Sequence, residues 1–114
     1  HDNDTTTGWY NGASEKEKDF TRRYLARSGT DISWDMIRAA WSSVAIMTLA
    51  TMQDLLSLGS EARMNFPGQA SGNWSWRMPA NALSPELMAR LRDTNFLYGR
   101  SIKKPEPQSE REAR

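Results

Sequence analysis

The chain begins with a histidine beside an aspartate, His1-Asp2, and this pair is the strongest candidate for chemistry in the sequence. An imidazole can hold or move a proton near neutral pH, and a carboxylate can accept hydrogen bonds or stabilise positive charge. Glycine and tryptophan gather further along, in residues 59–77. Because the chain does not begin with Met, we expect a processed or partial protein, with His1-Asp2 taken from the middle of an active site.

Two other interpretations of this start remain open. Asp2 and Asp4, with Asn3 between them, are also typical of a solvated turn. His1 at a free amino terminus could bind copper, but the usual brace of ligands needs a second histidine, and the sequence has one. We therefore expect no metal and no cofactor.

Composition excludes several classes of protein. The 114 residues fit one small domain, with 38% hydrophobic and 25% charged residues. A net charge of +1 gives no field that would attract nucleic acid or anionic lipid, so we expect neither nucleic acid nor a membrane as a partner. The absence of Cys excludes disulfides and cysteine catalysis. The longest apolar run, residues 44–52, is far shorter than the ~20 residues of a membrane helix, and the start lacks the features of a signal peptide.

Two helices are predicted in the first half of the chain. Ser14 and Glu17 form a capping box before a helix over about 15–27, and Gly29 supplies its stop. Ser33 is the predicted cap of a second helix, whose apolar stripe repeats every three or four residues. The stripe consists of Trp34, Ile37, Trp41 and Val44.

The residues after this second helix predict a strand. Residues 46–52 are apolar, include β-branched side chains and are followed by polar Gln53-Asp54, which favours a buried and possibly parallel strand. A helix continuing through the same residues is the alternative. Glycine and proline recur in residues 57–82, which predicts a long loop. A loop of this length often carries functional residues.

The C-terminal part begins with a clear helix start. Ser84-Pro85-Glu86 supplies a cap, a proline at the first position and an early acid, and the helix is predicted to end near Gly99. Residues 101–114 are charged and almost without apolar side chains, so we expect a disordered tail.

A helix, a strand, a long loop and a helix in this order are typical of the later part of a (β/α)8 barrel, whose active-site residues lie in loops after the strands. The predicted fold class is therefore α/β: the C-terminal portion of such a (β/α)8 TIM barrel. A complete barrel takes about 250 residues. We expect this portion to be incomplete on its own.

Four separated motifs carry a family resemblance. In chain order they are HDNDTTTGW, QDLL, GSEARMNFPG and SGNWSWR, at residues 1–9, 53–56, 59–68 and 71–77. They resemble the C-terminal part of the 4-alpha-glucanotransferases, also called amylomaltases or disproportionating enzymes. The match covers residues 1–100, which the resemblance assigns to the C-terminal part of the catalytic barrel, after the seventh strand and through the eighth strand and the final helix. Several motifs in the right order are far more specific than a lone His-Asp pair.

The resemblance implies a retaining enzyme of the alpha-amylase clan, which cleaves an alpha-1,4-glucan and passes the bound glycosyl group to the 4-hydroxyl of an acceptor glucan. Its partners would be maltooligosaccharides or alpha-1,4-glucan. A retaining mechanism uses one carboxylate as nucleophile and a second as acid/base. The resemblance adds a third carboxylate, which Asp2 matches.

The resemblance assigns roles to the first two residues, and the position of the long loop suggests roles for others. Asp2 would hold the 2- and 3-hydroxyls of the distorted sugar and stabilise the transition state, and His1 would contact the same ring. Arg63 and Asn65, in the loop after the presumed last strand, are candidates to bind substrate hydroxyls, with ordinary loop-stabilising hydrogen bonds as the alternative. Trp74 and Trp76 either stack on sugar or anchor the loop.

Two classes of function follow. The first is a part of a 4-alpha-glucanotransferase; because the nucleophile and the acid/base would lie before His1, we expect the chain to need the N-terminal remainder of the barrel and to be inactive alone. The second is a non-catalytic glucan-binding or structural module. Family members occur in bacteria and plant plastids, so the resemblance implies a bacterial cytoplasm or a plastid.

Overall fold

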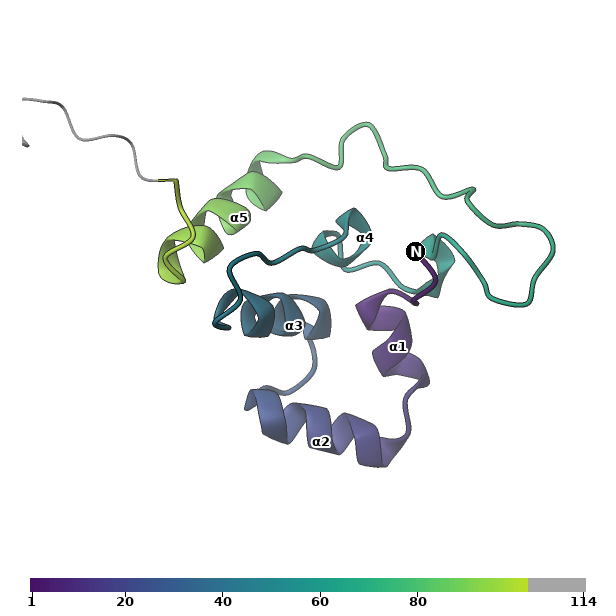
Figure 1. Cartoon of the computed structure of the whole chain (residues 1–114), viewed down its shortest axis with the longest axis horizontal. Coiled ribbons are helices and arrows are strands. Elements are labelled where there is room, and N and C mark those ends of the chain that lie inside the picture. Colours follow the sequence, from purple (N-terminus) through teal and green to yellow (C-terminus); the bar gives the residue numbers. More distant parts are fainter. Residues whose placement is uncertain (103–114) are drawn as a thin grey trace, which may run out of the picture.

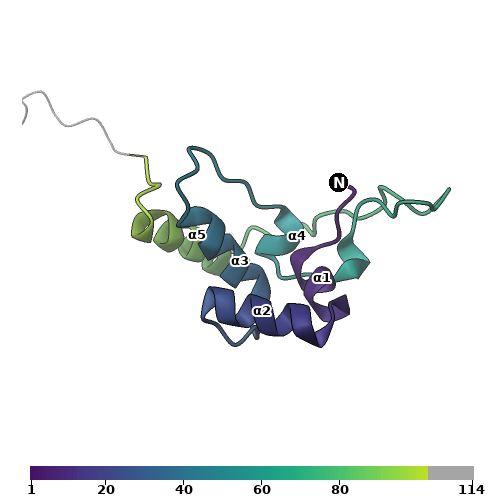
Figure 2. The ribbon, with the colours of Figure 1, turned by 60° about the horizontal axis from the view of Figure 1, so that its bottom comes forward.

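The computed structural model describes residues 1–102, and within that range the chain is built from helices. In chain order they are α1 (Thr6–Gly12), α2 (Glu15–Leu25), α3 (Ile32–Trp41), α4 (Met52–Leu55), the 3-10 helix η1 (Ser60–Ala62) and α5 (Pro85–Leu97). Helix α3 lies in the centre and contacts α1, α2, α4 and α5 (Figure 1, Figure 2). The tail predicted over 101–114 falls on residues 103–114, outside the described range, except for its first two residues.

The helix predicted at about 15–27 is confirmed as α2. Its capping box forms: Ser14 Oγ accepts from the backbone N–H of Glu17 at 3.2 Å, and the Glu17 carboxylate accepts from the backbone N–H of Ser14 at 3.3 Å. The helix ends earlier than predicted, at Ala26, which has a left-handed φ of 54°. Gly29 has a different use, because a Cβ there would lie 2.4 Å from the hydroxyl of Tyr10.

The second predicted helix is confirmed as α3, but its start is different. Asp31 occupies the cap position, so Ser33 lies inside the helix, and the prediction of Ser33 as the cap is wrong. The Ser33 hydroxyl is buried and donates to the backbone carbonyl of Asp54 at 2.5 Å. A serine that was predicted to start the helix therefore ties α3 to α4.

A small apolar cluster forms the core. Trp34, Ile37 and Leu87 are its buried members, contributed by α3 and α5. Partly buried residues pack around them: Trp41, Ala50, Met52, Leu55, Leu56 and Leu91. Val44 was predicted to continue the stripe of α3, but the helix ends at Trp41 and the side chain of Val44 is fully exposed.

The predicted strand over 46–52 is not present. Residues 46–51 contain no regular structure, and α4 begins at Met52. The segment is not buried either, since the exposed fractions of Ile46 and Leu49 are 101% and 85%. A strand needs a neighbour that takes up its backbone hydrogen bonds, and the described residues contain no other strand.

Two short helices were not predicted, and threonine caps start both. Thr5 Oγ1 accepts from the backbone N–H of Gly8 at 3.0 Å and begins α1. Thr51 Oγ1 accepts from the backbone N–H of Asp54 at 3.2 Å and begins α4. Neither helix shows a clear apolar repeat in the sequence. The threonine at each start was the only local signal for it.

The later part of the chain matches its prediction more closely. Residues 57–82 form a long loop, interrupted by η1. Helix α5 starts after Ser84, whose Oγ accepts from the backbone N–H of Leu87 at 3.1 Å, and it ends at Leu97, just before Gly99. The buried face of α5 is narrow, because Leu87 is buried while its neighbour Met88 is exposed.

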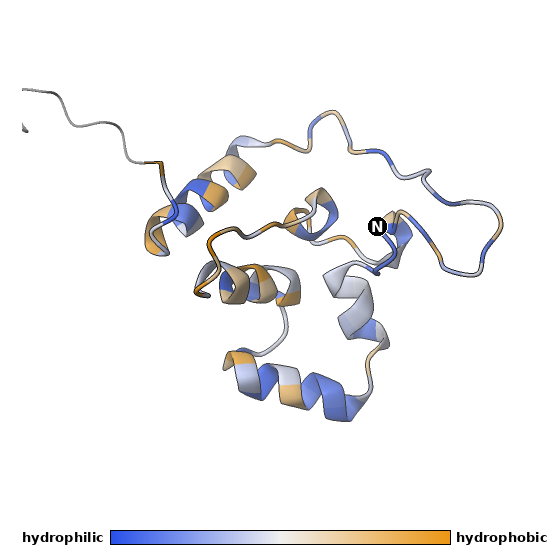
Figure 3. Cartoon of the chain, in the orientation of Figure 1, coloured by the Kyte–Doolittle hydropathy of each residue, from blue (hydrophilic) through white to orange (hydrophobic). Residues whose placement is uncertain are grey.

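The hydrophobic core is small for a chain segment of 102 residues. Their radius of gyration is 18.0 Å, against about 13 Å for a compact domain of 100 residues. Figure 3 shows a nearly continuous hydrophobic stretch along the segment between α3 and α4, which no other part of the described chain covers. Apolar surface of this kind marks an interaction surface in a stable protein.

Candidate functional site

The first residues of the chain lie against the beginning of the long loop. Asn65 Nδ2 donates to Asp2 Oδ1 at 2.7 Å, across 63 positions of sequence. Arg63 Nη2 donates to the backbone carbonyl of Asp2 at 2.5 Å. Figure 1 shows the N terminus beside η1, where this loop starts. The structure therefore brings together Asp2, Arg63 and Asn65, three of the four predicted site residues.

The fourth predicted residue completes the cluster. His1 Nε2 lies 3.2 Å from Asp2 Oδ1, the same oxygen that Asn65 contacts. The side chains of His1 and Asp2 are 57% and 63% exposed. Within residues 1–102, Asp2 Oδ2 has no hydrogen-bond partner. One carboxylate oxygen is thus held in place, while the other is open to accept a hydrogen bond from outside.

The guanidinium of Arg63 donates its hydrogen bonds to backbone carbonyls. Besides the bond to Asp2, its Nε donates to the carbonyl of Asn65 at 2.7 Å, and its guanidinium lies 5.3 Å from the ring centre of Phe66. These contacts are the loop-stabilising hydrogen bonds that the sequence left open as an alternative. They fix the loop in the position from which Asn65 reaches Asp2.

Trp74 is a member of the cluster whose position the sequence left open. Its ring centre lies 4.9 Å from that of His1, with the planes tilted by 41°. Its backbone N–H donates to the carbonyl of Met64 at 2.6 Å, and its φ of 59° is left-handed. Because Trp74 is 58% exposed, its ring is available to a ligand and is not buried against the core. Trp76 is less exposed.

Sequence reasoning missed a second set of contacts at the same place. Asp4 accepts from the backbone N–H of Thr5 at 2.7 Å and from the Ser60 hydroxyl at 2.8 Å. Gly8 allows this approach, because a Cβ there would lie 2.3 Å from Ser60 Oγ and 2.6 Å from Asp4 Oδ1. Gly8 in the first motif was the available signal, since a glycine within a helix often marks a close contact.

Gln53 and Asp54 connect the segments around the cluster. Asp54 Oδ1 accepts from the backbone N–H of Thr6 at 2.8 Å, so α4 is bound to the start of α1. Gln53 Nε2 donates to the carbonyl of Ala62 at 3.3 Å, which ties α4 to η1. Both residues therefore connect α4 to the segments that carry the cluster.

A cavity of about 480 Å³ opens beside the cluster. Its walls include predicted site residues and their supports: His1, Asp4, Gln53, Asp54 and Arg63. This volume falls in the range of about 300–1,000 Å³ that is usual for small-molecule sites. Of the predicted site residues, His1 and Arg63 line this cavity, whereas Asp2 and Asn65 do not. Its imidazole, guanidinium, carboxylate and amide groups can form hydrogen bonds with the hydroxyls of a sugar.

None of the helices in residues 1–102 is long and apolar enough to cross a bilayer. The same residues contain no group of three or more His, Asp and Glu side chains placed to hold a metal ion.

Comparison with known proteins identifies relatives along nearly the whole described chain. A family model for 4-alpha-glucanotransferase matches residues 1–83. The 4-alpha-glucanotransferase of Thermus thermophilus is 50% identical over 98 residues, covering 81% of this chain and 20% of its own length. The chloroplastic/amyloplastic enzyme of Arabidopsis thaliana is 47% identical, covering 88% of this chain and 18% of its own length.

A solved structure agrees with these matches. The amylomaltase from Streptococcus agalactiae in complex with acarbose superposes with a TM-score of 0.83 at 31% identity, over 90% of this chain and 21% of the other. The chain spans about a fifth of the length of the relatives it matches, and it matches the C-terminal part of amylomaltase. On the family model and on these identities, the chain belongs to the 4-alpha-glucanotransferase family.

Proposed function

We propose that this chain forms the C-terminal part of a 4-alpha-glucanotransferase barrel, in residues 1–100. The enzyme would transfer alpha-1,4-glucan segments to the 4-hydroxyl of an acceptor glucan, by a retaining double displacement, and the chain would supply Asp2 as the transition-state stabiliser. The observation that carries the proposal is the Asp2 carboxylate, held by Asn65 at 2.7 Å with one oxygen left open.

The geometry around Asp2 suits this role. In a retaining mechanism the sugar passes through an oxocarbenium-like transition state, and hydrogen bonds to its 2-hydroxyl strengthen as positive charge develops. An ionised carboxylate accepts such bonds, and it stabilises the transition state most when its position is fixed beforehand. Asn65 and His1 hold Asp2 Oδ1, so Oδ2 is the oxygen that would bind the sugar hydroxyls.

The neighbours of Asp2 have distinct proposed parts. His1 and Trp74, whose ring centres lie 4.9 Å apart, would contact the sugar ring directly through a polar edge and an aromatic face. Substrate binding by Arg63 and Asn65 stays a prediction. Their observed contacts go to Asp2 and to the loop backbone, which supports a positioning role for both.

The exposed apolar segment supports the need for the rest of a barrel. Val44, Ile46 and Leu49 are 103%, 101% and 85% exposed, and each large aliphatic side chain gains about 1.5–3 kcal/mol on full burial. We propose that residues 46–51 become the eighth strand when neighbouring strands are present. That pairing would supply the backbone partners and the cover that the segment lacks within residues 1–102.

The proposal can be tested with a joined enzyme, in which this chain replaces the matching C-terminal fifth of the Thermus thermophilus relative. Glucose release from maltotriose measures its disproportionation activity. We expect activity in the joined enzyme and none in the 114-residue chain. Asp2→Asn should lower the rate about 100-fold or more, because it removes a preorganised charge at the transition state. An unchanged rate in Asp2→Asn would overturn the role of Asp2.

A non-catalytic glucan-binding module is the second candidate, favoured by the exposed indole of Trp74 beside His1. This candidate predicts that the 114-residue chain binds maltoheptaose and that the joined enzyme transfers nothing. Transfer by the joined enzyme would decide for the first candidate. Cytoplasm or plastid as the location stays a prediction.

A further inference from the structure

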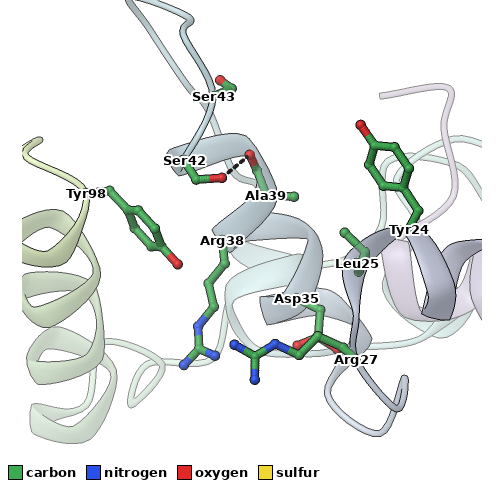
Figure 4. A pocket seen from close by; sticks show the side chains of 9 residues that line it. All are labelled: Tyr24, Leu25, Arg27, Asp35, Arg38, Ala39, Ser42, Ser43 and Tyr98. Atoms are coloured by element: carbon green, nitrogen blue, oxygen red, sulfur yellow. Dashed lines mark hydrogen bonds between the residues drawn. The ribbon is translucent and has the colours of Figure 1, made fainter.

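A second cavity lies on another side of the molecule. Its volume is about 430 Å³, and the ends of three helices form it (Figure 4). Tyr24 belongs to the last turn of α2, and Ser42 and Tyr98 are the C-caps that directly follow α3 and α5. Figure 1 places these three helix ends away from the N terminus, and the cavity shares no lining residue with the one beside His1.

Charged side chains line this cavity between two aromatic residues. Figure 4 shows Tyr98 and Tyr24 on opposite sides, with Arg38 and Arg27 between them. Asp35 also lines the cavity and is only 8% exposed. Within residues 1–102 the Asp35 carboxylate has neither a hydrogen bond nor an ion pair. No side-chain oxygen or nitrogen of the described residues is both buried and without a hydrogen-bond partner, so the Asp35 oxygens are reached from the cavity and can accept from a ligand that donates hydrogen bonds.

The charges around the cavity select a neutral ligand. Arg27 and Arg38 alone would favour an anion such as phosphate. Three helix C-termini meet at the same place, each with a partial negative charge of about half a unit, and Asp35 adds a full one. An anion would be repelled by these groups, and a cation by the two guanidiniums. A polyhydroxyl compound can donate to Asp35 and to helix-end carbonyls while accepting from the arginines.

The wall formed by Tyr98 is held before any ligand binds. Arg100, two residues further on, donates from Nε to the carbonyl of Trp41 at 2.8 Å and from Nη2 to the carbonyl of Ala45 at 3.0 Å. These bonds fix the end of α5 to the end of α3. A preorganised wall lowers the entropy lost on binding.

We propose that this cavity is a second glucan-binding site, which takes glucosyl units of an alpha-1,4-glucan chain away from Asp2. Tyr24 and Tyr98 stack on the apolar faces of the sugar rings, and Asp35, Arg38 and Arg27 bind their hydroxyls. The choice of glucan rests on the proposed function. A polymer held there raises its own effective concentration at the site beside His1.

The test is a titration of the 114-residue chain with maltoheptaose, followed by backbone amide NMR. We expect shifts at the ends of α2, α3 and α5. Tyr24→Ala should raise Kd about fivefold, and Arg38→Met about tenfold. Phe96→Ala and Arg92→Met are the matched controls on α5, because both side chains are exposed and neither lines this cavity. Equal affinity in the variants and the controls would overturn the proposal.

Two further outcomes separate this site from the proposed function. Shifts confined to residues 1–5 and 63–74 would retain the proposed function and overturn the second site. Shifts at the three helix ends with inorganic phosphate, and none with maltoheptaose, would assign the cavity to an anion and also overturn it.

The joined enzyme gives a second readout that does not depend on the fold of the short chain. Tyr24→Ala and Arg38→Met should raise KM for long glucans several-fold and leave maltotriose turnover unchanged. A fall in maltotriose turnover with no change in KM for long glucans would contradict a remote site. Asp2→Asn should show the reverse pattern, with turnover lost and affinity at the helix ends kept.

Discussion

The side-chain amide of Asn65 reaches the carboxylate of Asp2 across 63 positions of sequence, at 2.7 Å, and binds the same oxygen that His1 approaches at 3.2 Å. A long loop and the first two residues of the chain thereby share one hydrogen-bonded centre. Asn65 and His1 contact Asp2 Oδ1, and within residues 1–102 Oδ2 has no hydrogen-bond partner, so the protein holds the carboxylate through one oxygen.

Asn65→Ala tests whether the amide positions Asp2. Loss of a hydrogen bond to a charged group should lower kcat/KM of the joined enzyme about tenfold, through a lower kcat, because the loss is felt in the transition state. Disproportionation of maltotriose measures it. Asn81→Ala, in an exposed part of the loop, is the control and should behave as the unchanged enzyme. A rise in KM with constant kcat would instead indicate that Asn65 binds substrate directly.

Gly8→Ala tests the close approach of α1 to η1. A Cβ there would lie 2.3 Å from Ser60 Oγ and 2.6 Å from Asp4 Oδ1, so the Asp4–Ser60 hydrogen bond must break or shift. We expect a loss of about 1–3 kcal/mol in the free energy of unfolding of the joined enzyme, measured in urea.

Gly12→Ala is the matched control for that change, since both glycines belong to α1 and a Cβ at Gly12 meets nothing within 4 Å. It should be neutral or stabilise by up to about 1 kcal/mol, because alanine restricts the unfolded chain. Equal destabilisation by the two substitutions would mean that helix propensity, and not the contact with Ser60, explains Gly8.

Trp34→Phe tests the core. Trp34 is 1% exposed, its Nε1 donates to the carbonyl of Leu55 at 3.1 Å, and Arg90 lies 4.0 Å above its ring. The phenyl ring cannot make that hydrogen bond, so the partly buried Leu55 carbonyl loses its partner, and we expect a loss of about 1–3 kcal/mol in the free energy of unfolding. Thermal unfolding of the joined enzyme measures it. Phe96→Ala, at an exposed position on α5, should change the melting temperature little.

Ile46→Lys tests the proposed strand by comparing two contexts. In the 114-residue chain Ile46 is fully exposed, so a lysine there should change the free energy of unfolding by less than about 0.5 kcal/mol. In the joined enzyme the same lysine would be buried among strands, and we expect severe destabilisation or no folded protein. Soluble yield and urea unfolding measure both. A neutral effect in both contexts would leave residues 46–51 outside any sheet.

The local elements of this chain were predictable where a few adjacent residues decide the structure. The capping box of Ser14 and Glu17 starts α2, and Ser84-Pro85 starts α5, because each motif satisfies helix donors within three residues. The residues of the site could also be named, because the motifs that carry the family resemblance contain them. Their contacts across more than 60 positions could not be deduced from spacing.

The failures have a different physical origin. The strand at 46–52 was inferred from its own side chains, but a strand depends on backbone partners, and the described residues supply none. Ser33 fits the cap position by type, yet its hydroxyl makes a tertiary bond to Asp54, which no local pattern encodes. Gly8 and Ser60 were missed for the same reason, since their contact joins segments that lie far apart in the chain.

The contacts of Asp2 with Arg63 and Asn65 span 61 and 63 positions, which has a consequence for how the protein folds. Contacts between residues so distant in sequence close a large loop, and they form only after that loop has lost much of its entropy. The helices can form from local contacts, whereas this centre must assemble late. For the same reason it should be among the first parts to open, so hydrogen exchange at Asn65 should be fast while the amides of α3 stay protected.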